Sequence, residues 1–237
     1  NGSPLWYFQR EGGKFEGYRF ASLDPRGVLS EAIDPRRLIG CVAYPAAALA
    51  PGIVYHIEGD RFPVGELDGQ ESERVKHVSD AFNRAGLRSR VISDIRAEIW
   101  LKAWGSLSFN PISALTHATM EEICRHPDTR KLAADMMAEA QVIAEKLGIR
   151  FRHTIEKRLK GAEEVGAHKT SMLQDLEGGH QLETEALVGS VLEVGRLTEI
   201  PTPAIATVYA LRKLLENVLQ ASGGKLRVDR SAASKAA

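Results

Sequence analysis

The first part of the chain, up to about Ser93, carries short β-rich runs that are separated by turn residues. Gly59-Asp60 between two of these runs is a hairpin-type turn signal, although in the less usual order. One stretch with apolar residues every three or four positions ends at Gly86, which is typical of a helix. We therefore predict strands at 37–44, 53–58, 61–65 and 89–93, and one helix at 71–85.

After Asp94 the apolar positions recur at helical spacing, and we predict no further strand. Ser93 or Asp94 is a suitable N-cap for the first helix, and Gly148 is a suitable stop for the second. Thr202-Pro203 places proline at the first position of the last helix. The predicted helices are 95–107, 127–147, 183–197 and one that starts at 203, and Gly178-Gly179 separates the third from a helical piece before it.

These patterns predict an α/β part at 1–93, an all-helical part at 94–221 and a small, polar, flexible tail at 222–237. The chain of 237 residues is 43% hydrophobic and 26% charged, as in ordinary globular proteins. Its 31 Lys and Arg residues balance 31 Asp and Glu residues, so no overall field attracts nucleic acid or an anionic membrane.

The longest apolar stretch, 41–55, is interrupted by Pro45, Pro51 and Gly52 and is too short to span a bilayer. Cys41 and Cys124 are isolated, which argues against a disulfide scaffold or a zinc site. We therefore expect a cytoplasmic protein without a bound metal, a membrane segment or a nucleic-acid partner.

One helical segment, "AEIWLKAWGSLSFNPISAL", carries an amine, a hydroxyl and an amide at intervals of four residues: Lys102, Ser106 and Asn110. Positions four apart lie within about 40° on a helix, so these groups form one polar stripe if the helix continues that far. A lysine in a partly dry cleft is a candidate proton donor. In the alternative interpretation, Lys102 extends to solvent, the other two side chains bond to backbone, and Asn110-Pro111 ends the helix.

A second segment, "HKTSMLQDLEGGHQLETEAL", gathers polar side chains among few apolar ones, including Ser171 and Glu183. Glu183 falls just inside the N-terminus of a predicted helix, where the helix dipole favours the ionised carboxylate. The alternative is an ordinary capping carboxylate on a solvated turn.

Together these stretches resemble the ketopantoate reductase family, and the resemblance covers nearly the whole chain. "NGSPLWYF" is similar to the Asn-Gly segment that follows a Rossmann strand, and "IGCVAYPAAALAPGIVYHIEG" to the strands that come next. "DIRAEIWLKAWGSLSFNPISAL" and "SMLQDLEGGHQLETEAL" resemble the two signatures of the family, in the right order. The resemblance implies the later portion of a Rossmann-type NADP-binding domain at 1–93 and a helical substrate or dimerisation domain at 94–221.

The family reduces 2-ketopantoate to pantoate with NADPH, so the resemblance implies a small 2-oxo acid substrate, with a homodimer as a further possibility. It also implies a role for each matching residue: Lys102 as the general acid on the ketone oxygen, Ser106, Asn110 and Ser171 as substrate-binding residues, Asn1 near substrate and nicotinamide, and Ala46 and Glu183 near the cofactor. An ammonium near the ketone suits this chemistry because hydride addition builds negative charge on oxygen.

The chain departs from the family pattern at Ser106 and Met120, where members carry asparagine, and at Glu185, where aspartate is common. The smaller hydroxyl and the lost amide predict a larger pocket, so another branched 2-oxo acid is an alternative substrate. No GxGxxG occurs in the sequence, and the chain is therefore expected to be the later portion of such a reductase. A helical interaction module without catalysis and a different 2-hydroxy acid dehydrogenase are the competing interpretations.

Overall fold

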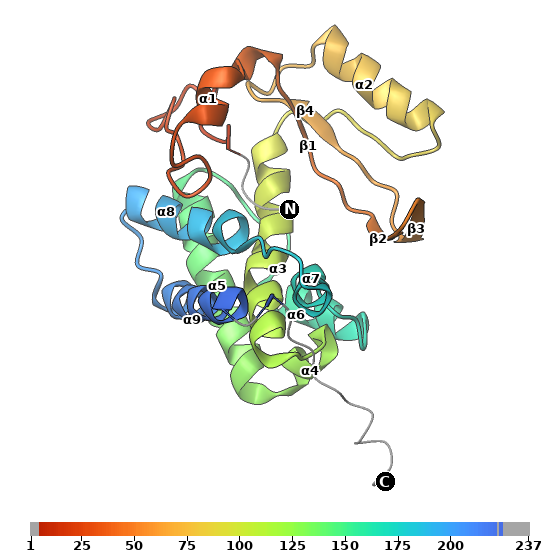
Figure 1. Ribbon diagram of the computed structural model, residues 1–237. Helices are drawn as coiled ribbons and strands as arrows, with labels where there is room; N and C mark the ends of the chain where they lie inside the picture. Colours follow the sequence, from red (N-terminus) through yellow and green to blue (C-terminus); the bar gives the residue numbers. More distant parts are fainter. Residues whose placement is uncertain (1–4, 222, 225–237) are drawn as a thin grey trace, which may run out of the picture. The chain divides into compact units, whose positions relative to one another are not determined.

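The computed structural model describes residues 5–221 and 223–224. The predicted site residue Asn1 and nearly all of the predicted tail lie outside this range. The chain divides into two compact units, and the border falls between Lys102 and Ala103, inside one long helix (Figure 1).

The first unit combines short helices with two antiparallel strand pairs, β1–β4 and β2–β3. The elements are α1 (Val28–Ala32), the 3-10 turn η1 (Pro35–Arg37), β1 (Ile39–Cys41), β2 (Ala46–Ala50), β3 (Ile53–Glu58), β4 (Val64–Glu66) and α2 (Glu73–Arg84). Helix α2 begins after Ser72, whose side chain accepts a hydrogen bond from the backbone N–H of Val75. The predicted helix at 71–85 and the predicted strand at 53–58 are therefore confirmed.

The predicted hairpin at Gly59-Asp60 is wrong. Strand β3 pairs instead with β2, which precedes it, and the turn between them is Pro51-Gly52, with Ala50 opposite Ile53. Proline fixes φ at the first turn position, and Gly52 adopts the positive φ of 73° that the second position of a type II turn needs. We did not predict β2 because its sequence, AAALA, consists of residues with low strand propensity.

The β1–β4 pair is the antiparallel ladder that organises the first unit, with Ile39 opposite Glu66 and Cys41 opposite Val64. It is shorter than the predicted strands at 37–44 and 61–65. The predicted strand at 89–93 is wrong as a regular element, because residues 88–92 form only isolated parallel bridges, from Arg88 to Arg61 and from Val91 to Val64 of β4. Backbone hydrogen bonds such as Ile92 N–H to Val64 O (2.8 Å) still attach this segment to the strand.

Helix α3 (Ile95–Thr116) begins directly on this ladder. Asp94 caps it by accepting the backbone N–H of Ala97 at 2.9 Å. Gly40 and Gly65 face each other across the ladder. A Cβ on Gly40 would lie 2.6 Å from Cγ1 of Ile95, so the absence of a side chain there lets the first turn of α3 lie close to the strands.

Helix α3 extends well beyond the predicted end at 107, through Pro111 to Thr116, so Asn110-Pro111 does not end it. A proline inside a helix removes a hydrogen bond and costs about 3 kcal/mol. Here Ile112, Ser113 and Ala114, which follow it, are almost completely buried, and this packing offsets the cost.

The second unit is a helical assembly around the buried face of α5, and its described residues include no strand. Trp104 is fully buried, donates its indole N–H to Met137 O at 2.7 Å, and stacks on Phe151. The fold class predicted from the sequence, α/β plus all-α, is confirmed. Besides α3, the elements are α4 (Met120–Arg125), α5 (Pro127–Lys146), α6 (Ile155–Glu164), α7 (Ser171–Gly178), the π-helical turn η2 (Glu185–Gly189), α8 (Ser190–Leu197) and α9 (Pro203–Ala221).

In the part of the chain that the structure describes, none of the helices is both long and apolar enough to cross a membrane.

The close approach of α3 to the ladder predicts that Gly40→Ala destabilises the protein. The added methyl group would overlap the Ile95 side chain, and overpacking of this kind typically costs about 1–3 kcal/mol. Urea unfolding followed by circular dichroism measures the loss. Gly161→Ala is the matched control, because a Cβ there meets nothing within 4 Å. That control is expected to be neutral or stabilising by up to about 1 kcal/mol, and equal stability of both variants would contradict the packing argument.

Candidate active site

Lys102 is the last residue of the first unit and is half-buried. Its Nζ donates a hydrogen bond to the backbone carbonyl oxygen of Ala43 and lies 5.6 Å from the centre of the Tyr44 ring. The ammonium is therefore held against the protein rather than extended into solvent. Both contacts favour the charged form of the amine, since a carbonyl oxygen and an aromatic face each attract a cation.

Ser106 and Asn110 follow Lys102 at intervals of four residues along α3. Of residues 103–110, Ser106 alone is not buried, so this hydroxyl interrupts an otherwise buried stretch. The serine that bonds back to the helix is Ser108, which donates to Trp104 O at 3.1 Å. Asn110 is 9% exposed.

Asn110 and Ser171, from the two separate signatures, meet within the second unit. The Asn110 Nδ2 donates a long hydrogen bond of 3.4 Å to Ser171 Oγ. Ser171 is the first residue of α7 and is exposed, while Thr170 caps the helix by accepting the backbone N–H of Leu173. This pair places an amide and a hydroxyl together at a helix N-terminus, where the dipole also favours an anion.

Glu183 is exposed, and its carbonyl oxygen accepts the first helical hydrogen bond, from Leu187 N–H at 3.0 Å. Glu185 is bonded to α9: Tyr209 Oη donates to its carboxylate at 2.9 Å, and Lys213 Nζ forms an ion pair with it at 2.9 Å. This carboxylate holds the π-helical turn to α9. From the two signatures we also expect Lys102, Asn110, Ser171 and Glu183 to line one cleft. These residues belong to two units, so this stays a prediction.

Ala46, the residue predicted to lie near the cofactor, begins β2 and is half-buried. The β2–β3 register shifts between Ala46 and Ala47, so Ile57 is the extra residue of a β-bulge. Asn1 lies outside the described residues, and nothing in the structure bears on its predicted role.

The structure gives roles to three residues of the first signature that we did not single out from the sequence. Arg96 donates to the carbonyl oxygens of Tyr7 (2.7 Å), Gln9 (2.8 Å) and Leu67. Glu98 accepts a hydrogen bond of 2.6 Å from Tyr44 Oη.

Trp100 completes this group by donating its indole N–H to Tyr7 Oη at 2.7 Å, and burial raises the pKa of Tyr7 well above its usual range. The sequence signal for the roles of Arg96 and Trp100 was their spacing, four residues apart on one helix.

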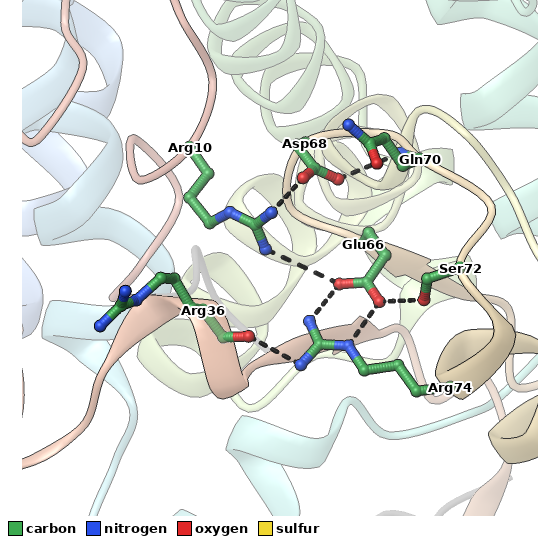
Figure 2. Close-up of a pocket in the computed structure, with 7 residues that line it drawn as sticks. All are labelled: Arg10, Arg36, Glu66, Asp68, Gln70, Ser72 and Arg74. Atoms are coloured by element: carbon green, nitrogen blue, oxygen red, sulfur yellow. Dashed lines mark hydrogen bonds and ion pairs between the residues drawn. The ribbon is translucent and has the colours of Figure 1, made fainter.

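A separate pocket of about 240 Å³ lies in the first unit (Figure 2). Glu66 is its centre: it is 2% exposed, accepts from Arg74 Nε at 2.6 Å and is also bonded by Ser72. Arg74 reaches further to Arg36 O at 2.7 Å, and Arg10 pairs with Asp68. The charged groups therefore satisfy one another, and we interpret the pocket as an ion-pair network that fastens α2 to β4.

Among the described residues, no group of three or more His, Cys, Asp or Glu side chains is placed to hold a metal ion.

The family model described as "Ketopantoate reductase PanE/ApbA C terminal" matches residues 94–216. A 2-dehydropantoate 2-reductase from Mesorhizobium japonicum is 52% identical over 216 residues, which are 91% of this chain and 66% of that protein. A 2-dehydropantoate 2-reductase from Archaeoglobus fulgidus is 33% identical over 186 residues, 78% of this chain and 63% of that protein.

A candidate ketopantoate reductase from Ralstonia solanacearum MolK2 has a similar crystal structure, with a TM-score of 0.87 and 36% identity over 92% of this chain and 67% of that one. The chain thus spans slightly less than two thirds of the length of these two curated relatives.

The network around Glu66 predicts an acid-sensitive contribution to stability. Glu66→Gln is expected to destabilise the protein by about 1–3 kcal/mol at neutral pH, because Arg74 would lose its charged partner. Hydrogen bonds from Arg74 and Ser72 outweigh the opposing effect of burial and lower the pKa of Glu66. The stabilisation is therefore complete above the ordinary carboxyl pKa and is lost as the pH falls through the lowered value.

Thermal unfolding of both proteins between about pH 3 and 7 tests this, and the difference between them should shrink below about pH 4. Glu73→Gln, on the helix α2 that also carries Arg74, is the control, since the Glu73 side chain is 78% exposed. A pH-independent difference would show that the carboxylate charge of Glu66 is not responsible.

Proposed function

Since the chain belongs to the ketopantoate reductase family, we propose that it carries the substrate-binding and proton-donating residues of an NADPH-dependent reductase of 2-dehydropantoate (ketopantoate) to pantoate. The observation that carries this proposal is the hydrogen bond between Asn110 and Ser171. These residues are 61 positions apart and come from the two signatures, yet their side chains face each other.

Lys102 is the proposed general acid. Hydride addition to the ketone carbon places negative charge on the ketone oxygen, and a nearby ammonium both stabilises that charge and supplies the proton. The position of Lys102 supports the role, because the residue is half-buried and its amine is bonded to the Ala43 carbonyl oxygen.

Asn110 and Ser171 are the proposed ligands of the substrate carboxylate. Their long mutual hydrogen bond of 3.4 Å is weak enough to be exchanged for bonds to an anion. An amide N–H and a hydroxyl can both donate to carboxylate oxygens, and the N-terminus of α7 adds a favourable field. Ser106 is proposed to line the same substrate site, and its small side chain makes a branched 2-oxo acid other than ketopantoate the second candidate substrate.

NADPH supplies the hydride when it is bound. Ala46 and Glu183 are the residues proposed to lie beside it. Their chemistry fits this role, since Ala46 has a small side chain next to a β-bulge and Glu183 presents an exposed carboxylate at a helix N-terminus. The homodimer, the cytoplasmic location and the role of Asn1 stay predictions.

Lys102→Ala in the full-length protein that carries this chain is expected to lower kcat for ketopantoate reduction by about 10²–10⁴-fold, the usual contribution of general acid catalysis. Lys102→Arg should not restore the rate, because guanidinium stays protonated. The absorbance of NADPH gives the rates, and Lys131→Ala, at a side chain that is 74% exposed, is the control.

A loss of less than about fivefold, on ketopantoate and on several branched 2-oxo acids, would remove Lys102 from the mechanism and favour an interaction module without catalysis.

Ser171→Ala is expected to raise KM for the 2-oxo acid about 10- to 100-fold and to leave KM for NADPH unchanged, since one hydrogen bond to a charged group is worth about 1.5–3 kcal/mol net. Initial rates at varied concentrations of each substrate separate the two constants. Gln141→Ala, at an exposed amide on α5, serves as the control. An equal rise in both constants would argue against a carboxylate ligand at this position.

A further inference from the structure

We propose that Tyr44, held in place by Glu98, is a positioning residue for Lys102. The proposal rests on the function proposed above for Lys102. All of the groups concerned lie in the first unit, so the argument depends on its internal geometry alone.

The register of the β1–β4 ladder fixes where Tyr44 lies. The pairing of Cys41 with Val64 continues beyond the regular strands, through the hydrogen bonds Val42 N–H to Pro63 O and Tyr44 N–H to Arg61 O, both 3.1 Å. Tyr44 is therefore directly opposite Arg61, and the guanidinium carbon of Arg61 lies 4.3 Å from the centre of the Tyr44 ring. This cross-strand pair restricts the ring from one side.

Glu98 restricts the other end of the same side chain. Its carboxylate accepts the Tyr44 hydroxyl at 2.6 Å, a short distance that is typical of a charge-assisted bond. Glu98 is also four residues before Lys102, so helical geometry places it on the face of α3 that carries the lysine. Helix α3 thus carries both Lys102 and Glu98, the residue that holds Tyr44 in place.

Lys102 meets this arrangement at two points, the Ala43 carbonyl oxygen and the Tyr44 ring. Ala43 and Tyr44 are consecutive residues, so the register of the ladder fixes the positions of both contacts. A lysine stem has four rotatable carbons, and each contact reduces the number of positions that the amine samples. Keeping the amine in one place reduces the cost of orientation in the transition state.

The charged and titratable groups near the amine include three residues of the first unit. Glu98 on α3 and Arg61 opposite Tyr44 are described above. Cys41 on β1 is the third, and burial raises the pKa of its thiol while the charge of Lys102 opposes that rise. Glu98 and the Tyr44 ring favour a charged amine, and Arg61 disfavours it, so loss of the ring is expected to make Lys102 release its proton at lower pH.

Tyr44→Leu in the full-length protein tests the proposal, with Tyr44→Phe as the conservative variant. Leucine removes the ring, and kcat should fall roughly tenfold or more, as misplacement of a catalytic group does. The alkaline limb of the kcat profile should also move down by about half a pH unit, the size of one exposed cation–π contact. Phenylalanine keeps the ring, so its alkaline limb should stay in place.

Tyr55→Leu is the matched control, because Tyr55 is 55% exposed on β3. Glu98→Leu should lower kcat, as Tyr44→Leu does, since it removes the hydrogen bond that holds the Tyr44 hydroxyl. A merely structural role of Tyr44 would lower the melting temperature of Tyr44→Leu without moving the alkaline limb. An unmoved limb in Tyr44→Leu would overturn the proposal.

A second measurement separates this proposal from the role of Lys102 in catalysis. Lysines are converted to ¹³C-dimethyl-lysine, the Lys102 signal is assigned with Lys102→Arg, and its pKa is followed by NMR. A lower pKa in Tyr44→Leu than in Tyr44→Phe supports the positioning contact even if Lys102→Ala retains full activity, in which case only the proposed function fails. Equal pKa values in both variants overturn the positioning contact, whatever the kinetics of Lys102→Ala.

Discussion

The spacing between helix α3 and the β1–β4 ladder is the constraint on which the proposed chemistry depends. Gly40 and Gly65 oppose each other in that ladder; a Cβ on Gly40 would overlap Ile95 at the start of α3, and one on Gly65 would overlap the carbonyl oxygen of Ile92 just before it. The helix can therefore begin within contact of the strands. Seven residues after Ile95, the same helix carries Lys102 to the Ala43 carbonyl oxygen. A shift of the first turn would be transmitted along a rigid helix to the amine.

The first signature, RAEIWLK, serves structure and chemistry in one helical segment. Arg96 ties three backbone carbonyl groups of the first unit together, and Trp100 bonds to Tyr7 in a buried environment. Glu98 holds Tyr44. Only Lys102 is proposed to act on substrate. Most residues of the signature therefore hold the structure around one amine. Catalytic groups generally need such rigid surroundings.

The two units differ in the hydrogen-bond partners of their buried charged side chains. In the first, Glu66 is surrounded by donors from Arg74 and Ser72, and its carboxylate is fully matched. In the second, Arg212 of α9 is completely buried and bonds to Thr184 Oγ1 at 3.0 Å, while burial lowers the pKa of its guanidinium. Both arrangements cost desolvation. The first attaches α2 to β4, and the second attaches the segment that contains Thr184 to α9.

The sequence by itself determined the fold class, the long helices and the order of the two signatures. Apolar spacing is local information, and it located α2, α5 and α9 because a helix repeats its buried face every three to four residues. The interval of four residues between Lys102, Ser106 and Asn110 marked a polar stripe on α3. In the structure, Ser106 is the one residue of 103–110 that is not buried. Even α4, which we did not predict, carries a readable signal in the capping box of Thr119 and Glu122.

Tertiary structure alone decided the rest, because the decisive contacts join residues that are distant in sequence. The partner of β3 depended on whether Pro51-Gly52 or Gly59-Asp60 made the turn, and both carry turn residues. The continuation of α3 through Pro111 depended on burial by other helices, which overrides the local cost of proline. The apolar stripe of α9 gave no sign that Arg212 would be buried beside Thr184. The placement of Tyr44 against Lys102 likewise follows from ladder register, which the sequence does not specify until the strands are paired.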